Sequence, residues 1–170
     1  MITPERPLPP MDADERTSLE SWLDFYRTTL AQKCDGLTEE QVRAASAPPS
    51  QLTLLGLVRH LTEVERTWFR RVLVHEDAPS VFSGDADTAL ADRGFVFDET
   101  ATYEDARRKW QAEIERAREN CAPRALEDTG TYRGGQVTLR WIYTHMIAEY
   151  ARHCGHADLI RERIDGSTGV

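Results

Sequence analysis

The 170-residue chain has little of what marks a secreted or membrane protein. Its three cysteines are odd in number and form no CxxC pair, which argues against a disulfide framework or a cysteine zinc site. Its apolar stretches are only a few residues long, too short to cross a bilayer. The first ten residues contain prolines instead of a charged start and an apolar run, unlike a secretory signal. We therefore expect a cytoplasmic protein with no membrane partner.

Positive charge is also scarce. Lys and Arg number 21 against 29 Asp and Glu, giving a formal net charge of −8. Because a phosphate backbone requires a basic face, we expect no nucleic-acid partner. Two enzyme motifs are missing as well. Gly134-Gly135 is not followed by the Lys-Ser or Lys-Thr of a phosphate-binding loop, and no GxSxG indicates a serine hydrolase.

Apolar residues at helical spacing are abundant. Four long helices are predicted, over about residues 12–34, 53–75, 102–123 and 138–163. Each opens with a residue that caps helices well: Asp12, Thr53, Thr102 and Thr138. A short helix is expected from Thr38, with Gln41 as its capping-box partner. Residues 128–136 contain three glycines and predict a turn-rich loop, and no segment predicts a strand.

These helices predict an all-α protein, a four-helix bundle in one domain over residues 1–170. Within it, residues 1–11 are expected to form a loose N-terminal arm. The stretch 78–100 is too long for a tight connection, so we expect a functional loop or one that carries a short helix.

The last predicted helix carries the pattern that points to chemistry. His145, Glu149, His153 and His156 recur in steps of three and four, all within roughly 40° of Glu149 on a helical wheel that also holds core residues. A buried carboxylate needs a compensating charge, which a divalent cation supplies. A single histidine on an apolar face is more often a hydrogen-bonded core residue. Four ionisable groups on one face favour a metal site.

Glu149 and His153 form an i, i+4 pair that can reach one ion. His60, at the edge of the apolar face of the second long helix, is the candidate third ligand. His145 and His156 are candidates for a fourth ligand, a proton carrier or groups that orient the ligands. Two imidazoles and a carboxylate suit zinc, which we expect first, and also nickel, iron or manganese. Three protein ligands leave positions open for water or substrate.

Two segments resemble a known family. Residues 52–68 read LTLLGLVRHLTEVERTW and residues 149–166 read EYARHCGHADLIRERIDG. The first resembles the second-helix segment of the DinB-like superfamily, and the second, with the residues from His145 on, resembles its last-helix segment. The resemblance extends over most of the chain. The chain is similar to an uncharacterised actinobacterial branch of this superfamily that is related to the mycothiol-dependent enzymes.

The resemblance implies the DinB/YfiT-like metalloenzyme fold, an up-up-down-down four-helix bundle that is often dimeric. It also implies a three-histidine metal site, with one ligand on the second helix and an HxxxH pair on the last. By position these ligands are His60, Glu149 and His153, so the sequence departs from the pattern at Glu149. A carboxylate still binds a divalent metal, but its negative charge weakens the Lewis acidity of the ion. His156 stands where many relatives have Gln.

Characterised relatives use the metal to activate a low-molecular-weight thiol and add it to an electrophile. The resemblance therefore implies a homodimeric, metal-dependent thiol S-transferase. Its partners are a small-molecule thiol such as mycothiol and an electrophile, and His145 or His156 moves the protons. Two alternatives stay open: a non-catalytic metal-binding or stress-response dimer, and a metal-dependent hydrolase that activates water at the same open site.

Overall fold

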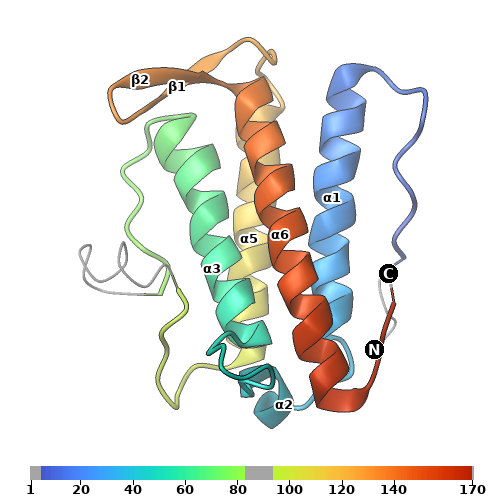
Figure 1. Ribbon diagram of the computed structural model, residues 1–170. Coiled ribbons are helices and arrows are strands. Elements are labelled where there is room, and N and C mark those ends of the chain that lie inside the picture. The colour runs from blue at the N-terminus through green and yellow to red at the C-terminus, as the bar shows by residue number, and fades with distance from the viewer. Residues whose placement is uncertain (1–4, 83–93, 170) are drawn as a thin grey trace. The chain divides into compact units, whose positions relative to one another are not determined.

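The computed structural model describes residues 5–82 and 94–169. In chain order the elements are α1 (Glu15–Cys34), α2 (Glu39–Arg43), α3 (Leu54–Arg66), the π-helix η1 (Thr67–Val72), α5 (Tyr103–Cys121), β1 (Thr129–Tyr132), β2 (Gly135–Thr138) and α6 (Leu139–Asp165) (Figure 1). An all-α protein was predicted, and the described residues are mostly helical with one small two-stranded sheet. Over the described ranges, none of the helices is long and apolar enough to span a bilayer.

The described residues form two compact units. One unit combines the residues up to Leu57 with those from Tyr143 onward, and it contains α1, α2 and most of α6. The other unit, Val58–Ile142, contains most of α3, together with η1, α5 and the two strands.

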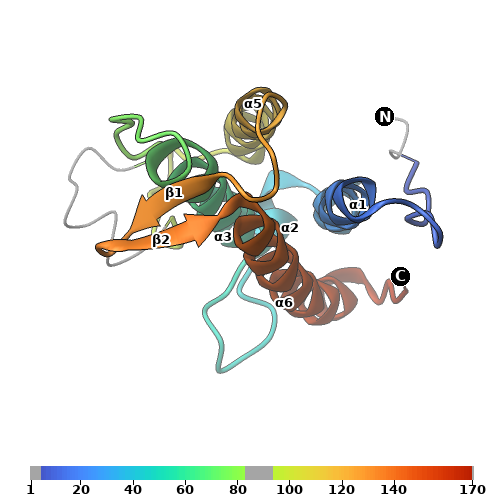
Figure 2. The ribbon, with the colours of Figure 1, turned by 90° about the horizontal axis from the view of Figure 1, so that it is seen from above.

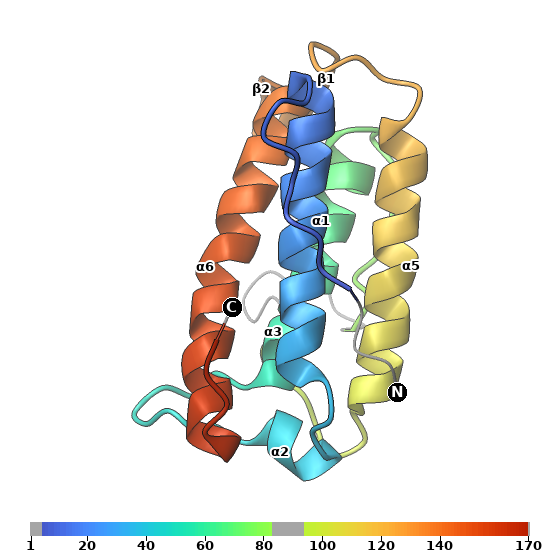
Figure 3. The same ribbon diagram turned by 90° about the vertical axis from the view of Figure 1, so that its right-hand side faces the viewer.

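In the first unit, α1 and α6 run side by side (Figure 3). Near one end of α6, the Tyr143 hydroxyl donates to a carboxylate oxygen of Glu20 at 3.0 Å. Near the other end, Arg161 donates to the carbonyl oxygens of Lys33 and Asp35 at 3.1 and 2.7 Å. The largest fully buried side chains that these two helices contribute to this unit are Leu23, Leu30, Met146, Tyr150 and Ile160. This packing fixes which face of α6 turns inward.

In the second unit, η1 contacts both α5 and β1. Its Arg70 and the preceding Arg66 both bind one carboxylate oxygen of Glu113 on α5, at 2.8 and 2.5 Å. On the β1 side, a Cβ atom added at Gly130 would lie 2.2 Å from the carbonyl oxygen of Val72. The strand can therefore approach the π-helix this closely only with glycine at that position.

The strands correct one prediction. Residues 128–136 were expected to form a turn-rich loop, but residues 129–138 form a two-stranded antiparallel hairpin that leads into α6, as Figure 2 shows. Arg133 and Gly134 form its turn with φ of 51° and 80°, the positive values that tight hairpin turns require. The glycines did predict the turn. The strands are four residues each and were missed because they lack a regular apolar alternation.

Two predicted helix boundaries are also wrong. α1 begins at Glu15, because the Asp14 carboxylate, and not that of Asp12, accepts from the Thr17 backbone at 3.0 Å. The helix expected to reach about residue 75 is α-helical only to Arg66 and continues as η1 to Val72. Residue 75 lies beyond η1 with a φ of 56°.

The threonine caps are confirmed at all four helices where they were predicted. The side-chain oxygens of Thr38, Thr53, Thr102 and Thr138 each accept a hydrogen bond from the backbone three residues later.

Of the stretch 78–100, residues 83–93 lie outside the described part. The functional loop or short helix expected there therefore stays a prediction. In the N-terminal segment, Arg6 donates to the Thr29 hydroxyl of α1 at 2.9 Å.

Candidate metal centre

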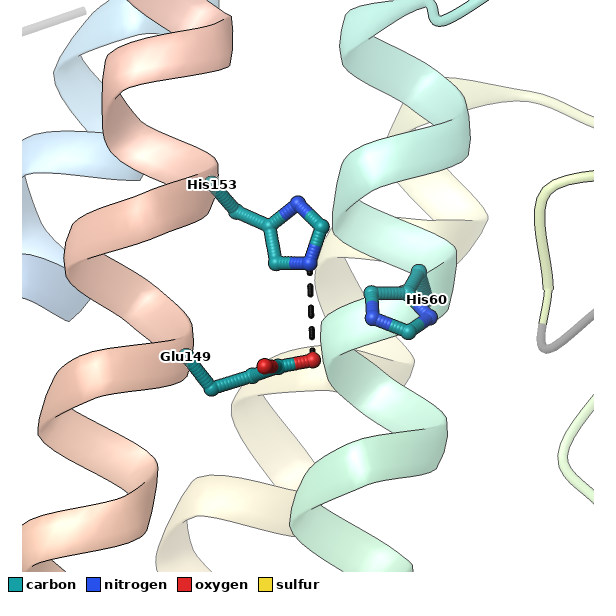
Figure 4. A group of neighbouring side chains, drawn as sticks. All are labelled: His60, Glu149 and His153. Atoms are coloured by element: carbon teal, nitrogen blue, oxygen red, sulfur yellow. Dashed lines mark ion pairs between the residues drawn. The ribbon is translucent and has the colours of Figure 1, made fainter.

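Glu149 and His153 lie one turn apart on the inward face of α6. Tyr150 and Met146, both fully buried, set this face. The Nε2 atom of His153 lies 3.4 Å from a carboxylate oxygen of Glu149, the pair joined by the dashed line in Figure 4. His153 is 7% exposed, and the Glu149 side chain is 20% exposed. Two ligand types thus face each other in a largely buried position.

His156 contacts the opposite side of the His153 ring. The Nδ1 atoms of the two imidazoles are 3.3 Å apart, and the rings meet edge to face. Burial lowers the pKa of His156, and the neighbouring His153 and Arg152 lower it further. A neutral His156 can accept a hydrogen bond from His153.

His145 lies one turn before Glu149 on α6 and is half-buried. Burial lowers its pKa, an effect that the Glu149 carboxylate opposes.

Next to His153, Cys154 is buried, and its thiol donates to the Tyr26 carbonyl oxygen at 3.5 Å. Burial raises the pKa of Cys154 to about 12, as expected for a packed thiol and not a nucleophile.

His60 is on α3 and only 2% exposed. Its imidazole stacks nearly parallel on the Phe95 ring, with the centroids 4.4 Å apart and 15° between the planes. The sequence placed His60 at the edge of an apolar face, and the structure buries it almost completely. Sequence reasoning missed Phe95, because 35 residues separate it from His60 and no periodicity connects them.

The ligand atoms offered by His60, Glu149 and His153 all lie within 4.8 Å of one another, and such a His/Glu/His group can hold a metal ion (Figure 4). Ligands bound at about 2.1 Å around a tetrahedral ion are separated by roughly 3.4 Å. The Glu149–His153 distance already matches this value. Two imidazoles and one carboxylate are donors that zinc accepts, and the carboxylate offsets part of the charge of a dication. The residues present therefore fit a divalent ion. His145 and His156 are not part of this group.

The family model described as mycothiol-S-transferase matches residues 18–166, which is most of the chain and includes His60, Glu149 and His153. No curated protein matches the sequence.

Proposed function

Because the chain belongs to the mycothiol-S-transferase family, we propose that it is a metal-dependent enzyme that adds a low-molecular-weight thiol such as mycothiol to an electrophile. The observation that carries the proposal is the His60, Glu149 and His153 group, whose ligand atoms lie within 4.8 Å of one another in a chain of this family. A divalent ion held there would favour the thiolate form of the thiol, which is the nucleophile.

In this proposal His60, Glu149 and His153 hold the ion, which we expect to be zinc. The Nε2 atom of His153 faces Glu149, so Nε2 is the ligand atom. A neutral imidazole that binds through Nε2 carries its hydrogen on Nδ1, and that atom faces Nδ1 of His156. We therefore assign His156 to orienting His153. His145, one turn before Glu149, is left to accept the proton released by the thiol.

The arrangement of the whole chain is part of the same proposal. Family membership supports a single domain in which α1, α3 with η1, α5 and α6 form a four-helix bundle, and it supports a homodimer. All three cysteines are free and buried, which supports a reducing, cytoplasmic location. Gel filtration with light scattering would decide between a monomer and a dimer.

Elemental analysis of protein purified without a His tag tests the metal site. We expect about one zinc per chain in the wild type and strong depletion in His60→Ala, Glu149→Ala and His153→Ala. His75→Asn is the matched control. His75 is exposed and has a φ of 56°, a conformation that Asn tolerates, so this variant should keep its metal. A wild type that stays metal-free after reconstitution with zinc, nickel and manganese would refute the site.

Thiol consumption with a panel of thiols and electrophiles tests the activity. We expect turnover that requires metal and disappears in His153→Ala. No metal-dependent turnover with any pair would refute the transferase.

One observation favours a second function. Two imidazoles and a carboxylate are also the zinc ligands of some hydrolases, in which the ion activates water. Glu149 supplies that carboxylate here, where the family pattern has a third histidine. Hydrolysis of activated esters that does not depend on added thiol would identify a hydrolase. A metal-dependent rise in melting temperature without either reaction would instead identify a non-catalytic metal-binding protein.

A further inference from the structure

Gly94, the first described residue after residue 82, lies beside α3 at the turn that carries His60. A Cβ atom added at Gly94 would lie 2.8 Å from the carbonyl carbon of Arg59 and 2.9 Å from the backbone nitrogen of His60. Gly94 also has a φ of 86°, which favours glycine. The two backbones therefore approach each other closely beside His60.

Arg59 fixes this segment with its side chain. Its guanidinium donates to the carbonyl oxygens of Gly94 and Val96 at 3.2 and 3.4 Å. The same guanidinium lies over the ring of Phe82, 4.1 Å from the centroid, and within 5.7 Å of the Phe97 centroid. The Arg59 side chain thus binds residues 94–96 to α3.

Glu63, one turn further along α3, binds residues 80–82. One of its carboxylate oxygens accepts from the Ser80 hydroxyl at 2.5 Å and from the backbone nitrogens of Val81 and Phe82 at 2.7 and 3.1 Å. Glu63 itself is buried. Residues 80–82 and 94–96 are therefore both attached to the stretch of α3 from Arg59 to Glu63.

Phe95 is held in place by these contacts and covers one face of the His60 ring. With the rings nearly parallel and their centroids 4.4 Å apart, rotation of the imidazole about its Cβ–Cγ bond would drive its edge into the phenyl ring. The plane of an imidazole decides where its lone pair points, because the metal must lie close to that plane. Phe95 thus restricts the direction in which His60 offers its nitrogen.

We propose that Phe95 is a positioning residue for the metal ligand His60, and that the attachment of residues 94–96 to α3 serves to hold it there. The inference rests on the proposed metal site and adds a determinant of metal affinity outside the ligands. A histidine whose plane is set by folding loses less rotational freedom when the ion binds, so the ion binds more tightly.

The test is the zinc dissociation constant, measured by competition with a chromophoric chelator. Phe95→Leu keeps an apolar side chain but removes the flat face. We expect it to weaken zinc binding by about 10- to 100-fold, the range seen when groups that orient metal ligands are removed. Phe95→Tyr keeps the flat face and should bind zinc with an affinity within about twofold of the wild-type value. The d–d absorption of the Co²⁺-loaded protein should change in Phe95→Leu and not in Phe95→Tyr.

Phe97→Leu is the matched control. Phe97 is also half-buried and lies two residues from Phe95, and its ring centroid is 5.7 Å from the Arg59 guanidinium. Phe97→Leu should leave the zinc affinity within about twofold of the wild-type value. Comparing the unfolding free energies of the metal-free variants separates a general loss of stability from a loss of affinity. If Phe95→Leu does not fold, Phe95→Met, which is unbranched and also lacks the flat face, takes its place.

The outcomes separate the two proposals. If the wild type binds no metal, the proposed metal site is refuted. If the wild type binds zinc with the same affinity as Phe95→Leu, the metal site stands and the positioning role of Phe95 is refuted. In a His60→Ala background, Phe95→Leu should have no further effect on the residual affinity. An effect of equal size there would show that Phe95 does not act through His60.

Discussion

The Nδ1 atoms of His153 and His156 lie 3.3 Å apart across one turn of α6. The other nitrogen of His153, Nε2, faces Glu149 at 3.4 Å. Both ring nitrogens of His153 are therefore engaged, each by a different neighbour on the same helix. Helical steps of three and four residues place a ligand partner on one side of this histidine and an orienting group on the other.

His156→Ala should weaken metal binding by about 10- to 100-fold without abolishing it, because His153 loses the group that fixes its Nδ1 side. His156→Gln should lose less, since an amide oxygen can still accept from Nδ1. Zinc competition titrations of the two variants beside His153→Ala measure this. If His156→Ala loses metal as completely as His153→Ala, then His156 is itself a ligand. If its affinity equals that of the wild type, the contact has no role in binding.

Glu149→His should keep the metal and raise the rate of thiol transfer at neutral pH. The substitution restores the three-imidazole set of the family pattern and removes one negative charge beside the ion. A drop of one unit in the pKa of the bound thiol would raise the thiolate fraction about tenfold. The measurement is the pH–rate profile of the metal-loaded variant, which should shift to lower pH. Glu149→Gln, whose amide is a weaker ligand, is the control and should lose metal. A slower Glu149→His enzyme at every pH would mean that the carboxylate does more than bind the ion.

Local rules predicted much of the secondary structure. Each threonine cap depends on residues within one turn, so Thr38, Thr53, Thr102 and Thr138 could be identified from their immediate neighbours. The approach of Glu149 to His153 follows from helical geometry in the same way. His60, Glu149 and His153 were the expected ligands and are the group whose ligand atoms lie close together. That they bind an ion stays a prediction.

Contacts between distant segments were not predictable. The stacking of Phe95 on His60 depends on how residues 94–96 return to α3, which the spacing of residues does not encode. Likewise, the position of β1 depends on the close approach of Gly130 to Val72, 58 residues earlier. The sequence shows a glycine at position 130 but not the backbone that it meets.

Gly130→Ala should lower the free energy of unfolding by about 1–3 kcal/mol, the usual range for forced overpacking. The added Cβ would lie 2.2 Å from the Val72 carbonyl oxygen and 2.8 Å from the Leu73 Cα, both backbone atoms that cannot rotate away. Urea denaturation measures the change. Gly135→Ala on the neighbouring strand is the control, because its nearest atom would be 3.6 Å away, an ordinary contact. Equal effects of the two substitutions would contradict the close approach of β1 to η1.

Asp165→Asn should lower the free energy of unfolding at neutral pH, and this difference from the wild type should shrink in acid. Arg161 donates to the Asp165 carboxylate at 3.1 and 2.8 Å, and the Ser167 backbone donates at 3.0 Å. These bonds, chiefly those from Arg161, lower the pKa of Asp165 to about 2. In the unfolded chain the pKa of an aspartate is about 3.9. A carboxyl group whose pKa is lower in the folded state contributes its stability above the unfolded pKa and loses it as the pH falls through the folded pKa.

The stability contributed by the Asp165 charge should therefore be complete above about pH 5 and decline between about pH 4 and pH 2. Urea denaturation of wild type and Asp165→Asn at pH 7, 4 and 3 gives the difference in unfolding free energy, which should shrink as the pH falls. The group is exposed, so the effect is small and should weaken in high salt. A difference that stays constant from pH 7 to pH 3 would mean that the substitution costs stability through the shape of the amide and not through the lost charge. Arg161 would then hold the end of α6 through its bonds to the Lys33 and Asp35 carbonyl oxygens alone.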